Sequence, residues 1–401
     1  MLKGRFAEEL AKIDVAELTS NLIKIPSYSF LENQEKDIAV FIHDLFEKEG
    51  IESKLIEIRP GRYNVYATLR GKKAKKKGRS LMFSGHIDTI PAYDMNNAFS
   101  GRIAEGKIFG RGACDVKGPM ASMIAAVIAL KRSGTALQGD VVFTGLADEE
   151  EQGRGVEYLV EYGPVCDAVI MGKPTDMKIA IGHKGLEWID VIVEGRKVHG
   201  GNKEEGINAI EMAARFIQKI YTEYVPVLNS RTYPVLGPPT INVGRIEGGD
   251  QPSTVAGECL IKLDRRCVPT ESIAQVYEEI EEICSQLHEE DPRFNAVVRD
   301  SFADAEPMLP HVPYCIDKDD PLVLAVQDAM AETEDCSWTG KVTAFPAWSD
   351  AGAISSVIDS KCIVMGPGDL GVAHSIHECI RVRDVEQAAL IYGLAAINYC
   401  K

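Results

Sequence analysis

The 401-residue chain has no apolar run of 18 or more residues, so we expect no transmembrane helix. Its first residues, 1–9, lack the apolar stretch of a signal peptide and are typical of a charged helix. Basic residues are in the minority, with 44 Lys and Arg against 60 Asp and Glu, and the formal net charge is −16. This charge disfavours nucleic acids and anionic membranes as partners.

Several cysteine and glycine motifs are also missing. The ten cysteines are scattered without C-x-x-C spacing, so buried free thiols in a reducing cytosol are the expected state. Cys114 fits this pattern, and we expect it to serve packing rather than catalysis. The glycine-rich segment 110–118 lacks the G-x-G-x-x-G spacing of a dinucleotide site. The only basic cluster, residues 72–79, is interpreted as a solvated hairpin tip.

The chain does contain enough apolar sequence for two domains. Its length exceeds the usual size of one domain, and 45% of its residues are hydrophobic. Up to residue 183, helical patterns such as 32–48 and 118–132 alternate with strand patterns such as 64–69. This alternation indicates a mostly parallel sheet with helices on both faces.

After residue 183 the pattern changes to strands that alternate apolar and polar residues, which is typical of a half-exposed antiparallel sheet. The order of strand, helix, strand, strand, helix, strand is ferredoxin-like. We therefore predict an α/β protein whose catalytic domain, 1–183 and 305–401, carries an inserted ferredoxin-like α+β domain at 184–304. The expected elements of the insert are 187–193, 208–225, 240–246, 257–263, 271–289 and 294–299.

Candidate metal ligands begin at His86-Ile87-Asp88, which follows an apolar segment (79–84) that predicts a buried strand. His86 and Asp88 alternate at the strand's end and therefore share one face. A His that binds a metal through one ring nitrogen needs an oxygen acceptor on the other, which orients the ring. The spacing supplies that pair, although by itself it is more typical of a surface hydrogen bond.

Three further segments place ligand residue types at strand ends or sharp turns. Asp115 lies in the Gly-rich turn 110–118. An apolar strand ends in four carboxylates, 148–151, which would repel one another without a cation. His374 follows another apolar strand in a Gly-rich loop. His, Asp, Glu and His form the ligand set expected for zinc or a related divalent ion, with a spare Glu as base.

These motifs resemble those of the di-zinc amidohydrolases and peptidases that include acetylornithine deacetylase, succinyl-diaminopimelate desuccinylase, aminoacylase and glutamate carboxypeptidase. The resemblance covers nearly the whole chain and implies zinc, with cobalt or manganese as alternatives. It also implies a homodimer whose inserted domain serves as lid and dimer interface. Asp115 would bridge two metals and Asp88 would orient a ligand. The implied metal ligands are His86, Asp115, Glu150 and His374.

The acidic run admits two registers against the family pattern Asp-Glu-Glu-x-Gly. Tyr158-Leu159 falls in register when the pattern begins at Asp148, and we favour this register. It makes Glu149 the general base and Glu150 a metal ligand. Sliding the pattern by one residue would shift these roles to Glu150 and Glu151.

One position departs from the family. The resemblance implies Gly-Glu-Pro-Thr, with a metal-binding Glu, where this chain has Lys173. Three hypotheses follow. The Lys173 charge partly replaces one metal among Asp115 and the glutamates; or Lys173, deprotonated or carbamylated, is itself a ligand; or Asp176 is the substitute ligand. The first requires no unusual chemistry.

The resemblance also suggests residues that contact the substrate. His199 matches a lid histidine that supports the oxyanion in the partner's site, and Arg266 matches an arginine that binds the substrate carboxylate. From its sequence alone, a salt bridge to Asp264 is the simpler role for Arg266. Ser253 stands where the family has an asparagine, and the Gly368 backbone is expected to help hold the carboxylate.

Together these features predict a cytoplasmic, metal-dependent hydrolase of an amide bond next to a free carboxylate. The substrate would be an N-acyl amino acid or a short peptide, and segment 349–352 favours an acetylornithine deacetylase-like enzyme. Two alternatives remain. One is a catalytically impaired relative that binds amino acids or peptides, and Lys173 and Ser253 support this alternative. The other is a metal aminopeptidase.

Overall fold

The computed structural model describes residues 2–72, 78–306, 308–333 and 338–401. Residues 73–77 of the basic cluster, and Cys336, lie outside the described residues. The chain forms two compact units, Met1–Gly182 with Ile316–Phe345 and Ser349–Lys401, and His183–Cys315 with Pro346–Trp348. The second unit continues past residue 304, where the strand alternation ends, because the backbone N–H of Leu186 donates to the carbonyl of His311 at 2.9 Å.

A nine-stranded sheet runs in the order β1-β2-β6-β3-β7-β15-β8-β13, with β14 paired to β8. All of it except β13 and the last residue of β8 belongs to the first unit. Its central strands β6, β3, β7 and β15 are parallel, whereas β1 and β2 pair antiparallel. The strands are β1 (Glu52–Arg59), β2 (Arg62–Leu69), β3 (Leu81–His86), β6 (Val141–Leu146), β7 (Ala168–Met171), β8 (Ile179–His183), β13 (Tyr314–Cys315), β14 (Val342–Phe345) and β15 (Lys361–Val364).

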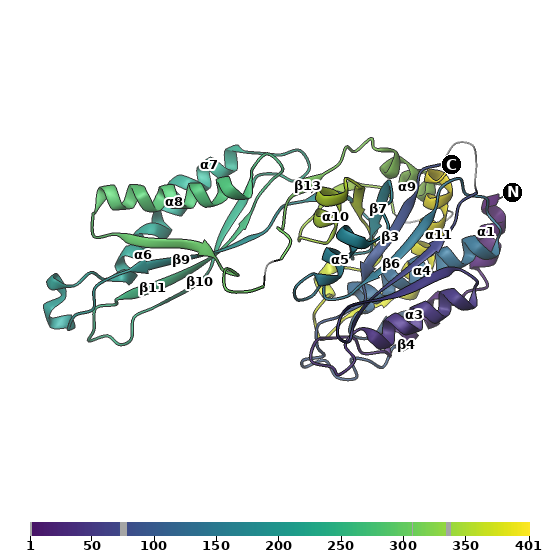
Figure 1. The fold of residues 1–401 in the computed structure, drawn as a ribbon, viewed down its shortest axis with the longest axis horizontal. Helices are drawn as coiled ribbons and strands as arrows, with labels where there is room; N and C mark the ends of the chain where they lie inside the picture. The colour runs from purple at the N-terminus through teal and green to yellow at the C-terminus, as the bar shows by residue number, and fades with distance from the viewer. Residues whose placement is uncertain (1, 73–77, 307, 334–337) are drawn as a thin grey trace. The chain divides into compact units, whose positions relative to one another are not determined.

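Helices cover both faces of this sheet, with α4 packed on α11 and α5 packed near α10 (Figure 1). A small sheet of β4 (Arg102–Ala104), β5 (Lys107–Phe109) and β16 (Cys379–Arg381) lies beside them. The helices are α1 (Leu2–Leu10), α2 (Val15–Ile23), α3 (Lys36–Lys48), α4 (Gly118–Arg132), α5 (Arg154–Tyr162), α9 (Pro321–Ala331), α10 (Ala351–Ile358) and α11 (Val382–Tyr399).

Helix α4 is the core helix of this unit. Together with the turn before it, the segment Ala113–Arg132 is long and apolar enough to cross a membrane, but it is buried inside the fold. Every residue from Gly118 to Leu130 is buried. Burial against the other helices accounts for this composition without a membrane.

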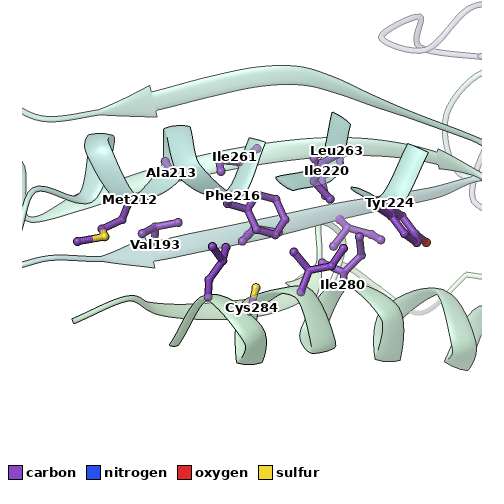
Figure 2. Close-up of a cluster of buried hydrophobic side chains, with 14 of the residues drawn as sticks. Val193, Met212, Ala213, Phe216, Ile220, Tyr224, Ile261, Leu263, Ile280 and Cys284 are labelled. Atoms are coloured by element: carbon purple, nitrogen blue, oxygen red, sulfur yellow. The ribbon is translucent and has the colours of Figure 1, made fainter. Parts of the chain in front are cut away.

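The second unit has the predicted ferredoxin-like order, and its antiparallel sheet runs β10-β11-β9-β12. Phe216, Ile261 and Ile280 meet in a core between the helices and the sheet (Figure 2). The predicted helix 208–225 is helical throughout: α6 passes into a π-helical turn (Ile220–Tyr224), and α7 follows with Pro226 in its first turn. The elements are β9 (Glu187–Glu194), α6 (Ala209–Lys219), α7 (Val225–Ser230), β10 (Thr240–Gly248), β11 (Glu258–Arg266), α8 (Ile273–Glu290) and β12 (Asn295–Asp300).

Glu187, at the start of β9, makes the stability of this unit depend on pH. Burial raises the pKa of Glu187 to about 7, against the effect of a 3.2 Å hydrogen bond from the Tyr277 hydroxyl. In the unfolded chain the carboxyl ionises near 4.5. Ionisation therefore opposes folding as the pH rises from that value through 7, and this cost is absent at lower pH.

We expect Glu187→Gln to raise the melting temperature at pH 8 and to change it little at pH 5. The gain at pH 8 should be about 1–2 kcal/mol of unfolding free energy, a value reduced because part of the group reaches solvent. Thermal unfolding at the two pH values measures it. Glu194→Gln, at the exposed end of the same strand, is the matched control. An equal gain at both pH values would contradict the account.

Candidate active site

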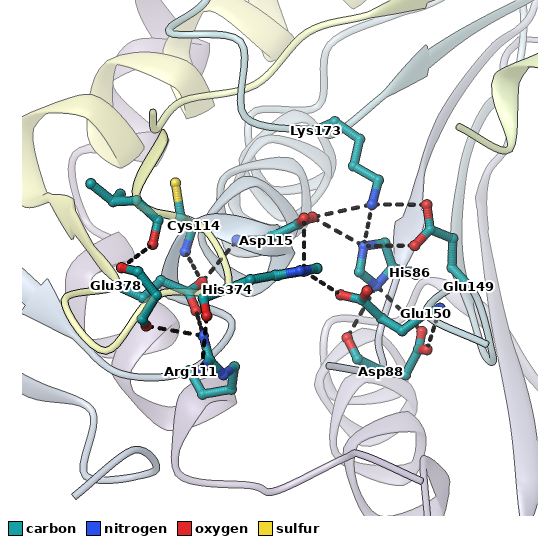
Figure 3. A network of polar contacts seen from close by, with 12 residues as sticks. His86, Asp88, Arg111, Cys114, Asp115, Glu149, Glu150, Lys173, His374 and Glu378 are labelled. Carbon is teal, nitrogen blue, oxygen red and sulfur yellow. Dashed lines mark hydrogen bonds and ion pairs between the residues drawn. The ribbon is translucent and has the colours of Figure 1, made fainter. Parts of the chain in front are cut away.

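The carboxyl ends of four parallel strands converge at one edge of the central sheet. His86 ends β3, Glu149 and Glu150 follow β6, Lys173 follows β7, and His374 lies in the loop after β15. Open α/β sheets bind ligands at this edge because the loops that leave the strands meet there. The predicted ligands come together from segments far apart in the sequence (Figure 3).

His86 is 1% exposed, and both of its ring nitrogens have oxygen partners. Nδ1 lies 3.1 Å from the backbone carbonyl of Asp88 and 3.3 Å from its Oδ1. Nε2 lies 3.2 Å from Oδ1 of Asp115. Asp88 also accepts a 3.0 Å hydrogen bond from the backbone N–H of Glu150. It therefore links the histidine to the acidic turn, as an orienting residue would.

Asp115 is held by a buried acid whose role the sequence did not reveal. Glu378, with no exposed surface, accepts hydrogen bonds from the backbone N–H groups of Cys114 and Asp115 at 3.0 and 3.1 Å. Its other oxygen lies 2.6 Å from the Arg111 guanidinium. Glu378 immediately precedes β16, which pairs with β5 just ahead of the Asp115 turn. Its partners lie more than 260 residues away in the chain, so no local pattern indicates them.

Asp350 is a second buried acid, and its neighbours in the sequence indicate no chemical role for it. It is 2% exposed, and its Oδ1 has no hydrogen-bond partner within the described residues. Burial raises the pKa of Asp350 well above its usual range, and the nearby charge of Glu149 adds to the effect. Asp350 precedes α10 in the segment that suggested substrate specificity.

Asp115, Glu150 and His374 form a group that fits a divalent ion. One ligand atom from each lies within 4.8 Å of the other two. Nε2 of His374 lies 3.1 Å from Oε1 of Glu150 and 3.6 Å from Oδ2 of Asp115. Imidazole nitrogen and carboxylate oxygen are both zinc ligand types, and a catalytic site with three protein ligands keeps a further position open. His374 is 47% exposed, so such a position would be accessible to a substrate.

The second group, His86, Glu149 and Glu150, also has ligand atoms within 4.8 Å of one another. Here the ammonium of Lys173 lies among the ligand atoms, 2.8 Å from His86 Nε2 and 2.8 Å from Glu149 Oε1 (Figure 3). Burial alone would lower the pKa of Lys173, but the carboxylates of Asp115, Glu149 and Glu150 outweigh it and raise that pKa. This charge would repel a cation placed within the same group.

Two of the four acidic residues at 148–151 lie among the candidate metal ligands, and the other two lie beside Arg62. The side chains of Glu149 and Glu150 are each 10% exposed and lie inside the cluster. Glu151 is 37% exposed and lies 3.7 Å from Arg62, which also pairs with Asp148. Glu149 and Glu150, rather than Glu151, therefore lie beside the other ligand residues.

Other predicted residues lie apart from the cluster. The Asp176 carboxylate lies 3.6 Å from Arg381 and belongs to neither ligand group. The Gly368 carbonyl accepts a 2.8 Å hydrogen bond from the backbone N–H of Asp176. With a φ of +102°, Gly368 turns the chain toward Cys114, and a Cβ there would lie 2.5 Å from the Cys114 sulfur.

Three predicted substrate residues belong to the second unit. Arg266 forms a bidentate ion pair with Asp264, at 2.7 and 2.9 Å. This salt bridge is the simpler of the two roles that the sequence suggested for Arg266. His199 is exposed, and its Nδ1 accepts a 3.1 Å hydrogen bond from the backbone N–H of Gly201. Ser253 is also exposed, and its carbonyl accepts from Gly200 at 2.7 Å.

Comparisons with known proteins agree with this geometry. Residues 82–398 match the model of a family described as peptidase family M20/M25/M40. A peptidase M20 domain-containing protein of Schizosaccharomyces pombe is 30% identical over 279 residues, which cover 68% of this chain and 64% of that protein. Acetylornithine deacetylase of Myxococcus xanthus is 29% identical over 80% of each chain. Aminopeptidase PepT of Bacillus cereus shares the fold, with a TM-score of 0.77 at 19% identity over 97% of this chain and 98% of that one.

Proposed function

Because the chain belongs to peptidase family M20/M25/M40, a family of hydrolases, we propose that it cleaves an amide bond next to a free carboxylate. The substrate class is an N-acyl amino acid or a short peptide, and the enzyme is acetylornithine deacetylase-like. One observation supports this most strongly: Glu149, whose side chain is 10% exposed, lies beside the Asp115–Glu150–His374 ligand group. That pairing is what metal-assisted hydrolysis needs.

Asp115, Glu150 and His374 would hold the divalent ion, for which we propose zinc. When bound, such an ion polarises a carbonyl and lowers the pKa of water. Glu149 is the general base that takes a proton from the attacking water and later delivers it to the leaving amine. Asp88 fixes the ring of His86 through two contacts, and Glu378 fixes the backbone of Asp115.

The second unit supplies the remaining parts of the proposal. Its residues 184–304 serve as lid and dimer interface in a homodimer, and His199 of one protomer supports the oxyanion in the partner's site. Arg266 binds the substrate carboxylate with its guanidinium after releasing Asp264, and Ser253 and the Gly368 backbone contribute polar contacts. We place the enzyme in the cytoplasm, because the nine cysteines among the described residues are all free thiols.

Two alternatives remain from the sequence. Lys173 and Ser253 support a catalytically impaired relative that binds amino acids or peptides. A metal aminopeptidase is the other, since an aminopeptidase has the same fold. Substrates with blocked and with free amino termini distinguish the two enzymes, because a deacylase cleaves the former and an aminopeptidase the latter.

The test is a panel of N-acetyl amino acids, N-succinyl amino acids and unblocked dipeptides, incubated with the purified chain before and after metal removal. The proposal expects turnover of blocked amino acids that stops on chelation and returns with Zn²⁺. Turnover of unblocked dipeptides alone would fit the short-peptide part of the proposal, and a strict requirement for their free amino group would favour the aminopeptidase. Binding without turnover, measured by calorimetry, would favour the impaired relative.

A further inference from the structure

We propose that this centre holds a single divalent ion, in the Asp115–Glu150–His374 group, and that the ammonium of Lys173 replaces a second ion. This inference concerns the metal content of the site and rests on the proposed function only for the identity of the site. Its main observation is the position of the Lys173 ammonium among the remaining ligand atoms.

Strand register brings Lys173 to this point. β7 and β3 are parallel, and Met171 is the register partner of Ser84. Two residues further along each strand, Lys173 and His86 are neighbours at the same edge of the sheet. The long side chain of Lys173 therefore reaches the ring of His86 and the carboxylates of Asp115 and Glu149.

The Lys173 ammonium contacts the same side-chain atoms that a metal ion would bind. It has three N–H donors, and three acceptors surround it: His86 Nε2 at 2.8 Å, Glu149 Oε1 at 2.8 Å and Asp115 Oδ1 at 3.2 Å. Lys173 is 5% exposed, so these contacts replace nearly all of its hydration. All three acceptor atoms belong to residue types that bind metal ions.

The tautomer of His86 agrees with this arrangement. Nδ1 lies 3.1 Å from the backbone carbonyl of Asp88, which can only accept, so Nδ1 carries the proton of this hydrogen bond. Nε2 then accepts from the Lys173 ammonium at 2.8 Å, and the neighbouring Asp115 Oδ1 accepts from the same ammonium at 3.2 Å. A zinc-bound histidine is held in the same tautomer by its outer partner. Nε2 of His86 is thus oriented to accept from a cation, and in this structure the cation is the Lys173 ammonium.

Formal charge gives an independent reason to expect that Lys173 replaces a second metal ion. The family resemblance places a glutamate at position 173, and a glutamate together with one dication carries a net charge of plus one. The lysine carries the same charge by itself. Exchanging Glu and one ion for Lys173 therefore leaves the charge around Asp88, Asp115, Glu149 and Glu150 unchanged. No second metal is needed to balance the four carboxylates.

The surroundings of Lys173 also disfavour its carbamylated and neutral forms. A carbamylated lysine would place a carboxylate beside Glu149 and Asp115, and a neutral lysine would leave those acids without their cation. Asp176 does not substitute as a ligand, because it is engaged with Arg381 at 3.6 Å and lies outside both ligand groups. Intact-mass measurement distinguishes a free from a carbamylated lysine directly.

The experiment counts Mn²⁺ bound by the chelator-stripped full-length chain, using equilibrium dialysis with elemental analysis. We expect about one Mn²⁺ per wild-type chain and about two per Lys173→Glu chain, because the substitution restores a carboxylate and removes the ammonium. Electron paramagnetic resonance should show an isolated ion in the wild type and coupled ions in the variant. Lys178→Glu, an exposed lysine in the same loop region, is the matched control and should stay at about one.

Two Mn²⁺ ions per wild-type chain, or none, would overturn the proposal, as would a carbamylated Lys173 in the intact mass. A folded Lys173→Glu chain that still binds one ion would also overturn it. Should that variant fail to fold, the wild-type count and spectrum decide alone. Hydrolysis is not part of the readout, so a single-ion chain without turnover would refute the proposed function and leave the role of Lys173 intact.

Discussion

Replacing Glu149 by glutamine is expected to lower kcat for amide hydrolysis by about 10²–10⁴-fold, the usual contribution of a general base. Metal content should stay at the wild-type value, because Asp115, Glu150 and His374 form their ligand group without Glu149. Steady-state kinetics and elemental analysis on the same preparation measure both quantities. Glutamine keeps the size of the side chain but cannot accept the proton from water.

Glu151→Gln is the matched control, since it makes the same chemical change two residues further along the turn. Glu151 is 37% exposed and faces Arg62 at 3.7 Å, so we expect kcat to remain near the wild-type value. This pair of variants also tests the register of the acidic run. Loss of activity in Glu151→Gln, with retention in Glu149→Gln, would contradict the assignment of the base.

The largest expected effect on stability comes from Glu378→Ala, at about 3–5 kcal/mol of unfolding free energy. The substitution leaves the buried Arg111 guanidinium without its 2.6 Å partner. It also removes the acceptor of two backbone N–H groups, those of Cys114 and Asp115. Urea unfolding monitored by circular dichroism measures the change.

Two comparisons make that result specific. Glu386→Ala, on the exposed side of α11, removes the same chemical group from a surface and should change stability by less than about 0.5 kcal/mol. Glu378→Gln keeps an acceptor for the backbone groups and should destabilise less than Glu378→Ala. Equal stability of Glu378→Ala and the wild type would refute the role of this acid in holding the Asp115 turn.

Periodicity in the sequence was sufficient for much of the fold. Alternating apolar and polar residues predicted the strands of the ferredoxin-like unit, and the unbroken apolar segment predicted α4 with its observed bounds, 118–132. Two helices differ from the predictions. The first predicted helix, 32–48, begins at Lys36 rather than residue 32. The helix predicted at 208–225 contains a π-helical turn at Ile220–Tyr224 and continues to Ser230.

The site was predictable where a residue type and a strand end coincide. His86, Glu149 and His374 carry such signals, and the structure brings them to one edge of the sheet. The contacts of Lys173 depend on β7 lying next to β3. Local sequence patterns do not indicate the order of strands in a sheet. Glu378 and Asp350 are buried acids whose surroundings come from distant segments, so their sequence neighbours do not indicate a role.

The most direct test of the account is a titration of activity with metal. The chelator-stripped chain receives increasing Zn²⁺, and the hydrolysis rate of the best N-acyl amino acid of the panel is followed against bound metal. We expect no rate without metal, a linear rise, and a plateau at about one ion per chain, because Lys173 occupies the second group. A full rate in the absence of metal, or a rise that continues to two ions, would contradict the account.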